Sequence, residues 1–335
     1  MLAWLFLPAA LAAHYVVRDG DTLSSIADAL GDPALVGELR AQNRLSDEEE
    51  PLPGTVLVLP DLEGTVGSQA AHVATIRGTG TVRGLDGSTS PLEVGMSLAP
   101  GEVACTDAES FSRIRLARGL DSYDHDDVSL LPETCMEVTS TRSWSGGRSA
   151  LVELQQGALR VHSSGADGGE VAVISDAGMT TGTSGGFRVA LEPEATRTEA
   201  TAGEVSVIGG GTEVSLQVGE GSRVRAGQAP EPPTRLPDAG QPLTPLHGVV
   251  LYRPAFSWSP APGALGYQLE ISTDPNFTDL LLTQNLPTTD WNPSALFLPF
   301  RVDGLWWRLS SFDRTGFQGI PSEGRVLQLP PGVGP

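Results

Sequence analysis

Lysine is missing from the sequence, so all 21 basic residues are arginine, set against 41 acidic residues. We interpret the missing lysine first as coding bias. The formal net charge is −20, and the acidic residues are spread over the whole length rather than gathered in a tail. A surface this acidic repels phosphate backbones and anionic lipids, which excludes nucleic acid and membrane surfaces as general partners.

Histidine is scarce, and no catalytic motif accompanies it. The histidines are scattered, with no His-x-x-His or His-Glu-x-x-His spacing and no Gly-x-Ser-x-Gly elbow. We therefore predict that the protein is not an enzyme and has no cofactor. Distant side chains can still meet in a fold, so a hydrolase with an unrecognised site stays as a disfavoured alternative. The five histidines are His14, His72, His125, His162 and His247.

Only two cysteines occur, Cys105 in EVACTD and Cys135 in PETCME, both in strand-like segments. In an oxidising compartment, one disulfide between them would close a loop of about thirty residues and stabilise the fold by about 3 to 4 kcal/mol in the chain-entropy model. Two buried free thiols are the alternative. A metal pair is disfavoured, because no histidine or third cysteine lies at ligand spacing from either residue.

Long apolar runs are absent, which excludes a membrane-spanning helix. The short run MLAWLFLPAALAA ends in small residues that suit a signal peptidase, so we predict a signal peptide over residues 1–13. A buried strand is the alternative, because the usual positive charges are missing. His14 follows the run instead of a cysteine, which disfavours a lipid anchor. The expected location is the periplasm or cell envelope.

The 40 glycines and 26 prolines favour a turn-rich, mainly β architecture of several domains. A small-residue stretch near residue 65 and the proline-rich segment 227–245, GQAPEPPTRLPDAGQPLTP, divide the chain. We interpret segment 227–245 as a spacer that cannot pack. The predicted domains are therefore residues 14–60, 70–226 and 246–330.

The first of these segments changes period from strand to helix. HYVV predicts a short strand, and Leu23, Ile26, Ala27 and Leu30 recur at helical spacing. Asp21 or Thr22 can cap that helix and Gly31 can end it, while DPALVGELRAQN predicts a second helix with Asp32 as its cap and Pro33 at its first position. GTVLVLP returns as a strand, so the expected order is β-α-α-β.

This β-α-α-β segment resembles the LysM module over its whole length. The LysM pattern is a strand, Gly-Asp-Thr-Leu, a helix, a second helix ending in Asn, then Pro-Gly and a strand ending in Leu-Pro. The matching residues are Val16, Val17, Gly20, Asp21, Thr22, Leu23, Ile26, Ala27, Leu39, Asn43, Pro53, Gly54, Leu57, Leu59 and Pro60.

The resemblance implies a groove that binds N-acetylglucosamine units of peptidoglycan or a related glycan. Turn backbone groups would pair with acetamido groups, while Leu23 and Leu45 would cover the methyl. The alternative is that Asp21 and Thr22 merely cap a helix and Asn43 merely ends one. With no aromatic stacking partner evident and one module only, we expect weak binding. The implied glycan-binding residues are Gly20, Asp21, Thr22 and Leu23 on one side and Asn43, Arg44 and Leu45 on the other.

The middle segment alternates apolar and polar residues in short strands between glycine turns, which predicts a sandwich or β-roll. LQQGALRV and ATAGEVSV look like hairpins built as two copies of one unit. The segment resembles the FecR-type periplasmic domain in the order of VGMSLAPGEVACTD, LLPET, GALRV, TGTSGGFRV and VGEGSRV. The resemblance implies a domain that contacts a protein partner in envelope signalling.

The last segment alternates Tyr267, Leu269 and Ile271, and again Leu305, Trp307 and Leu309, so each strand is expected to bury one face. It resembles a fibronectin type III or Ig-like sandwich, with Trp258 as the expected core tryptophan.

Two acidic stretches were weighed as ion sites. Asp121, Asp124, His125, Asp126 and Asp127 could offer ligands to calcium, but the EF-hand spacing is absent, and we predict a solvated acidic loop over 121–127 without metal. SDEEEP at 46–51 is expected to be a solvated turn.

From these features we expect a non-catalytic, exported envelope protein. It would bind peptidoglycan through the LysM segment and present its β domains to an envelope protein that the sequence does not name. The alternative is a regulatory or sensor component that acts through the FecR-type segment.

Overall fold

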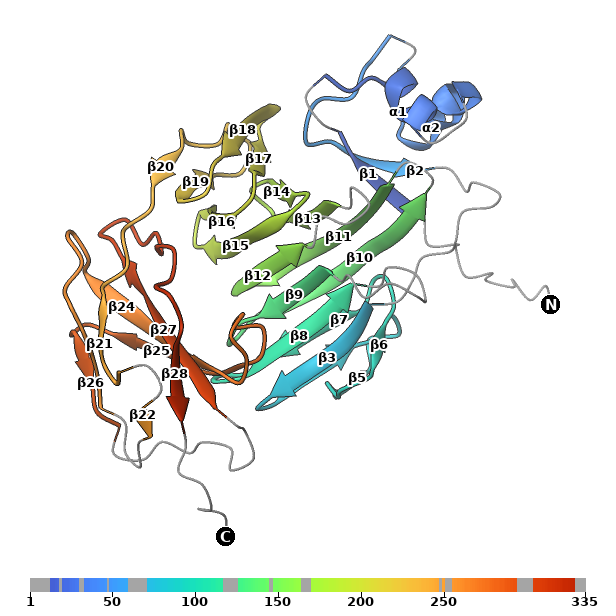
Figure 1. Cartoon of the computed structure of the whole chain (residues 1–335). Helices are drawn as coiled ribbons and strands as arrows, with labels where there is room; N and C mark the ends of the chain where they lie inside the picture. The colour runs from blue at the N-terminus through green and yellow to red at the C-terminus, as the bar shows by residue number, and fades with distance from the viewer. Residues whose placement is uncertain are drawn as a thin grey trace.

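The computed structural model describes residues 13–17, 20–29, 33–46, 48–59, 71–116, 126–144, 147–163, 170–246, 249–250, 255–293 and 304–328. The predicted signal peptide therefore lies outside the described residues except for Ala13, and the acidic segment 121–127 except for Asp126 and Asp127. The predicted helix end and cap at residues 30–32 also lie outside them. Within the described part of the chain the fold is mainly β, and its helices lie in the N-terminal module (Figure 1).

The N-terminal module, residues 13–59, has the expected β-α-α-β order. Strand β1 (Ala13–Val16) pairs antiparallel with β2 (Val56–Leu59), and between them come α1 (Leu23–Ala29), the 3₁₀ turn η1 (Pro33–Leu35) and α2 (Val36–Gln42). The second helix was expected to begin at Pro33, but α2 begins three residues later, after the tighter turn. The core of the module consists of Val17, Leu23, Ile26, Ala27, Leu35, Leu39, Leu57 and Leu59.

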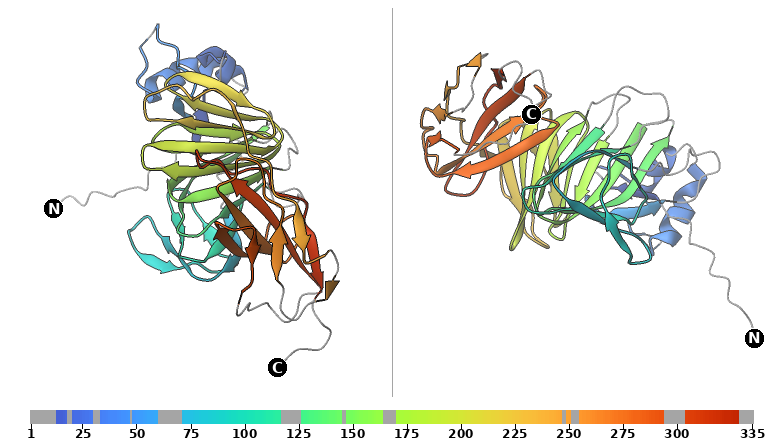
Figure 2. Two further views of the ribbon diagram at one scale, coloured as in Figure 1. Left: turned by 90° about the vertical axis from the view of Figure 1, so that its left-hand side faces the viewer. Right: turned by 90° about the horizontal axis from the view of Figure 1, so that it is seen from below.

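The middle domain is a sandwich of two nine-stranded sheets (Figures 1 and 2). In spatial order, the first sheet contains β18 (Thr212–Leu216), β17 (Val205–Gly209), β14 (Met179–Gly182), β13 (Glu170–Ile174), β11 (Gly147–Gln156), β10 (Cys135–Trp144), β7 (Val103–Thr106), β4 (Gly80–Arg83) and β5 (Thr89–Pro91). The second sheet contains β20 (Thr234–Arg235), β19 (Glu220–Val224), β16 (Ala195–Ala202), β15 (Gly185–Glu192), β12 (Ala158–Ser163), β9 (Asp126–Leu130), β8 (Phe111–Leu116), β3 (Ala71–Arg77) and β6 (Ser97–Leu98).

The chain passes back and forth between these two sheets, and their facing sides form one core. Alternation along each strand produces this core, because one side of each sheet is apolar and packs on the other. Ile114 and Val128 of the second sheet, for example, share the core with Met136 and Val152 of the first. The expected sandwich architecture is thus observed.

The two segments predicted as hairpins are corners between the sheets, so that prediction is wrong. LQQGALRV runs from β11 in the first sheet to β12 in the second, and ATAGEVSV runs from β16 in the second sheet to β17 in the first. A glycine makes each corner: Gly157 has φ +81° and Gly203 has φ +72°. A Cβ at Gly157 would lie 2.7 Å from the carbonyl oxygen of Glu133, and one at Gly203 would lie 2.0 Å from that of Ser184.

Cys105 and Cys135 form a disulfide within the first sheet. They lie directly opposite each other on β7 and β10, with a Cα–Cα distance of 4.1 Å. Their neighbours Ala104 and Met136 are fully buried while the two cysteines are half-buried, so the disulfide lies on the outer side of the sheet.

The C-terminal sandwich, residues 242–328, consists of a three-stranded and a five-stranded sheet. Its core packs Phe256, Trp258, Leu269, Trp307 and Leu309, which includes the expected core tryptophan. The three-stranded sheet contains β21 (Pro242–Thr244), β23 (Phe256–Trp258) and β26 (Asp290–Trp291). The five-stranded sheet contains β22 (Val249–Val250), β28 (Arg325–Gln328), β27 (Leu305–Phe312), β24 (Gly266–Ser272) and β25 (Leu280–Leu286).

The proline-rich segment 227–245 packs, contrary to expectation. Its strand β20 pairs with β19 at the edge of the second sheet, and β21 pairs with β23 at the edge of the C-terminal sandwich. Leu236 between them is buried. Prolines are tolerated here because edge strands do not need every backbone N–H.

The C-terminal sandwich packs against the outer side of the second sheet (Figure 2). Glu270 on β24, only 1% exposed, forms ion pairs with Arg160 on β12 and, at 2.7 Å, with Arg308 on β27. Burial alone would raise the pKa of Glu270, but the two guanidinium groups outweigh burial and lower it to about 2. Arg77 and Asp279 form a more exposed pair at 2.8 Å across the same interface.

Replacing Glu270 with glutamine should destabilise the protein by about 3 to 5 kcal/mol, because it leaves two largely buried guanidinium groups without a counter-charge. Since the folded-state pKa of Glu270 is about 2 against an ordinary 4.5, its contribution is complete above about pH 5 and is lost as the pH falls toward 2. The difference in unfolding free energy between wild type and Glu270→Gln should shrink over that range in urea titrations. Arg77→Gln, the control, should cost at most about 1 kcal/mol. A difference that stays constant with pH would contradict the assignment.

Removing the disulfide with Cys105→Ser and Cys135→Ser together should lower the unfolding free energy by about 3 to 4 kcal/mol, because the unfolded chain regains the freedom of the closed loop. Urea unfolding of the wild type with and without reductant checks this. The double variant should show no response to reductant, and equal stability of the variant and the oxidised wild type would contradict the prediction.

Candidate functional site

The turn before α1 in the N-terminal module is built around Gly20 and Thr22. The Thr22 and Ser25 side chains cap the helix reciprocally: Ser25 N–H donates to Thr22 Oγ1 at 3.1 Å, and Thr22 N–H donates to Ser25 Oγ at 2.9 Å. Gly20 has φ +84°, and a Cβ added there would meet nothing within 4 Å. Asp21 accepts a hydrogen bond from the Tyr15 hydroxyl at 2.7 Å. Thr22 is therefore the cap, and the turn faces open space at Gly20.

Leu23 follows this turn but does not face solvent. Its side chain is 0% exposed and belongs to the core of the module, so the expected contact between Leu23 and a ligand methyl group is wrong. Helical spacing from Leu23 to Ile26 and Ala27 already points it inward.

Glu50 connects the two sides of the predicted groove. Its Oε2 accepts the backbone N–H of Leu23 at 2.8 Å, while its Oε1 lies 3.2 Å from Arg40 Nη2. Arg40 also donates to the carbonyl oxygens of Ser46 and Glu49. The expected solvated turn at 46–51 is exposed at Ser46 and Glu48–Glu50, but Glu50 also holds it against the start of α1. Since 27 residues separate Leu23 from Glu50, no local pattern could have shown this contact.

Asn43 is occupied by the framework of the module. Its Nδ2 donates to the carbonyl oxygens of Leu39 and Val58, both at 2.8 Å, and its Oδ1 accepts the Val58 N–H at 2.6 Å. The side chain thus ties α2 to β2. Next to it, Arg44 is exposed with φ +57°, and Leu45 is half-buried against the core.

The structure therefore separates the seven predicted residues into two groups. The Leu23 and Asn43 side chains are committed to core and framework, while five residues stay wholly or partly accessible. Those five are Gly20, Asp21, Thr22, Arg44 and Leu45. Their accessible groups are mostly turn backbone, together with the Arg44 guanidinium and the Leu45 side chain.

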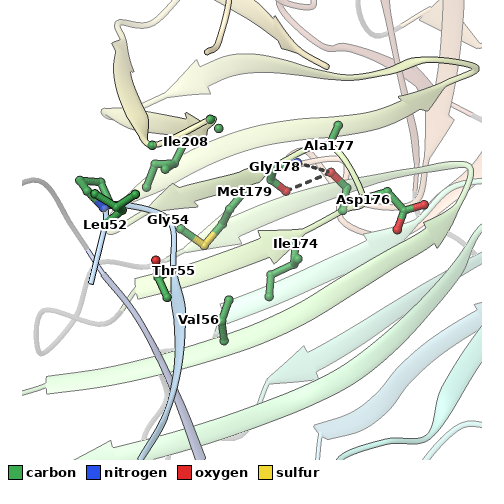
Figure 3. Close-up of a pocket in the computed structure, with 15 residues that line it drawn as sticks. Leu52, Gly54, Thr55, Val56, Ile174, Asp176, Ala177, Gly178, Met179 and Ile208 are labelled. Carbon is green, nitrogen blue, oxygen red and sulfur yellow. Dashed lines mark hydrogen bonds between the residues drawn. The ribbon is translucent and has the colours of Figure 1, made fainter. Parts of the chain in front are cut away.

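A cavity of about 320 Å³ lies between the N-terminal module and the first sheet (Figure 3). Residues 52–56 of the module form one wall, and the turns at 174–179 and 208–211 form the other. Gly54 is needed here, since a Cβ would lie 2.5 Å from Ile208 Cγ2. Gly54 N–H also donates to the Val17 carbonyl at 2.8 Å. The cavity therefore lies near the chain end of β1 that leads into the Gly20 turn.

The acidic segment does not form a solvated loop at its described end, so that prediction is wrong for Asp126 and Asp127. Both are buried in β9, and Asp127 lies 3.6 Å from Arg113 and 3.3 Å from Arg115 on neighbouring β8. Among the described residues, no three or more His, Cys, Asp or Glu side chains gather as a metal site. Of the helices described, none has the length and apolar content that crossing a membrane needs.

Residues 15–60 match the LysM domain family, so the N-terminal module is a LysM domain. No curated protein matches the chain in sequence. Among solved structures, similarity was found to two crystal structures of proteins from Parabacteroides distasonis that are described provisionally as anti-sigma factors. The first has a TM-score of 0.31 and 15% identity, covering 40% of this chain and 59% of that one. The second has a TM-score of 0.29 and 20% identity, covering 37% of this chain and 60% of that one.

This chain thus spans less than two thirds of either structural neighbour. With TM-scores below 0.5, these likenesses carry no argument about the middle domain.

Substituting Asn43 with alanine should unfold the LysM domain selectively. The change removes three hydrogen bonds and takes the side-chain partner away from the N–H and C=O of Val58, at a cost of about 2 to 4 kcal/mol. Hydrogen exchange should speed up across residues 13–59 while the two sheets of the middle domain keep their protection. Gln42→Ala, at an exposed position of the same helix, is the control and should leave exchange unchanged. Unaltered exchange in Asn43→Ala would contradict the structural role.

Proposed function

We propose that the protein is an exported, non-catalytic component of the cell envelope that binds peptidoglycan through its LysM domain. The observation that carries this proposal is the LysM match of residues 15–60. LysM is a binding domain, and binding N-acetylglucosamine-containing glycan is the function we assign to this copy.

The geometry of the Gly20 turn supports this assignment. The turn offers backbone at a position with free space in front of it, and Glu50 holds the facing loop in place. Backbone N–H and C=O groups fixed in this way can pair with acetamido groups with little further loss of their own conformational entropy. We expect weak, reversible binding from a single module in which Tyr15 is the aromatic residue near the turn.

The two β domains in this proposal provide surfaces for protein partners and carry out no chemistry. The regulatory alternative, signalling through the middle domain, rests on the sequence resemblance of residues 70–226 to FecR-type domains.

Cosedimentation of the full chain with purified peptidoglycan tests the binding. Gly20→Asn should reduce binding about tenfold, because it adds a side chain in front of the turn, and asparagine tolerates the left-handed backbone. Gly87→Asn is a matched control in the middle domain: Gly87 has φ +79°, and a Cβ there also meets nothing within 4 Å. It should bind as the wild type does.

Soluble N-acetylglucosamine oligomers should compete with peptidoglycan in this assay. Failure of the wild type to cosediment would refute the proposal, and equal binding by Gly20→Asn would refute the assigned turn. Incubation with cell wall should release no muropeptides, and any release above a buffer control would refute the non-catalytic assignment.

A further inference from the structure

The outer side of the second sheet carries a row of side chains in direct register across neighbouring strands. Arg113 on β8 faces Ser129 on β9, which faces Arg160 on β12. Arg160 in turn faces Arg188 on β15, and Arg188 faces Glu199 on β16. Like charges directly opposite each other on adjacent strands destabilise a sheet. This row nevertheless holds three arginines and only one acid, although the formal net charge of the protein is −20.

Arg188 shares its nearest acid, Glu199, with Arg197. Glu270 is shared by Arg160 and Arg308, and Glu199 Oε1 lies 2.8 Å from Arg197 Nη1. Arg188 Nε is 3.8 Å from Glu199 Oε2, beyond hydrogen-bond distance. Arg188 is 8% exposed, and its Nε makes no hydrogen bond to any described residue.

The pKa of Arg188 agrees with this geometry. Burial is the main cause that lowers it to about 10; the attraction of Glu199 and Glu270 raises it, and the repulsion from Arg160 and Arg197 lowers it. Arg188 is still protonated at neutral pH, so the sheet holds a buried cation that lacks a full counter-charge.

Arg188 lines a cavity of about 500 Å³ between the second sheet and the C-terminal sandwich. The sheet contributes Arg160, Arg188 and Glu199 to its walls, and the sandwich contributes Phe277, Arg308 and Gln318. A cavity of this size suits a small organic ligand, for which sites of about 300 to 1,000 Å³ are usual.

Four buried polar atoms on residues that line this cavity have no hydrogen-bond partner among the described residues. Two are donors, Arg160 Nη1 and Arg188 Nε, and two are acceptors, Glu199 Oε2 and Gln318 Oε1. Each such atom costs free energy in the empty state, and native structures leave few of them unpaired. These atoms belong to side chains on both walls of one cavity, and Arg188 Nε and Glu199 Oε2 lie 3.8 Å from each other. A ligand that supplies both acceptors and donors would complete their hydrogen bonding once these side chains turn toward it.

We propose that this cavity binds a small carboxylate that also carries N–H donors, the chemistry of an amino acid or a short peptide end. The carboxylate accepts hydrogen bonds from the Arg188 guanidinium, whose fork of donors suits two carboxylate oxygens. The N–H groups donate to Glu199 Oε2 and Gln318 Oε1. Phe277 provides an apolar wall.

A purely anionic ligand fits less well. Inorganic phosphate could pair with Arg188, but at neutral pH it would bring negative oxygens toward the Glu199 carboxylate and leave the two orphaned acceptors largely unpaired. The site is independent of the proposed glycan binding, because it lies on the second sheet, whereas the LysM domain packs against the first.

Thermal unfolding and calorimetric titration of the full chain test the site with three probes at equal ionic strength: L-glutamate, glutarate and inorganic phosphate. Glutarate has both carboxylates of glutamate but no ammonium group. At ten times its Kd, L-glutamate should raise the Tm by about 3 to 5 °C. Glutarate should bind at least fivefold more weakly, and phosphate should give no shift beyond that of chloride.

Arg188→Met should abolish the shift caused by L-glutamate. The variant should keep or raise the Tm measured without ligand, because replacing an incompletely paired buried charge by an apolar side chain removes a desolvation cost. Arg235→Met is the control at an exposed arginine whose side chain is 83% accessible, and it should respond to glutamate as the wild type does.

Asn276→Asp is a second variant for the case that Arg188→Met does not fold. Asn276 is exposed and lines the cavity, so a new negative charge there should weaken glutamate binding without disturbing the core. Gln228→Glu adds the same charge at an exposed position that does not line the cavity and should have no effect.

The proposal fails if none of the probes binds, which would indicate a cavity filled with water. It also fails if folded Arg188→Met binds L-glutamate as the wild type does. Binding of phosphate as strongly as of glutamate would overturn the requirement for N–H donors.

Discussion

Glu270 is the residue on which the relation between the middle domain and the C-terminal sandwich depends. One buried carboxylate faces Arg160 of the second sheet and Arg308 of its own sandwich. Moving the two domains apart would break the ion pair of Glu270 with Arg160 and leave Glu270 only its partner on the same sandwich, Arg308. Further contacts, such as the Gln318 N–H to Glu199 Oε1 at 3.1 Å, join the same two domains. These contacts tie the two domains together, and residues of both line the Arg188 cavity.

The middle domain packs against a different domain on each of its two outer sides. Val56 of the LysM domain packs with Met179 and Ile208 on the outer side of the first sheet, so that contact is apolar. The contact of the second sheet with the C-terminal sandwich instead combines arginine–acid pairs with an apolar cluster of Phe111, Leu131, Phe277 and Leu280. Both outer sides of the middle domain are thus partly covered by another domain. The covered strands carry side chains that pack against that domain instead of facing solvent.

Periodicity predicted the elements better than it predicted their connections. Helical spacing placed Leu23 and Ile26 in the LysM core, and alternation placed Leu269 and Trp307 in the C-terminal core. The corner at Gly157 could not be distinguished from a hairpin, because whether β12 returns beside β11 or crosses to the other sheet is decided by contacts with Glu133 and Thr134. The proline-rich segment 227–245 was misjudged for a similar reason, since edge pairing leaves no pattern of its own.

The two candidate sites differ in which polar groups lack a hydrogen-bond partner within the fold. This difference also determines how far the sequence could predict each site. In the LysM domain the Asn43 side chain, the most prominent polar one in the motif, makes its hydrogen bonds within the fold, so the proposed recognition rests on turn backbone, which a sequence motif can locate. At Arg188 a side-chain nitrogen lacks a hydrogen-bond partner. This follows from the register of five strands and the approach of a second domain, neither of which can be seen in the sequence. A backbone site discriminates mainly by shape. A buried guanidinium with an incomplete counter-charge discriminates by charge as well, because a ligand of the wrong charge would add to its desolvation cost instead of offsetting it.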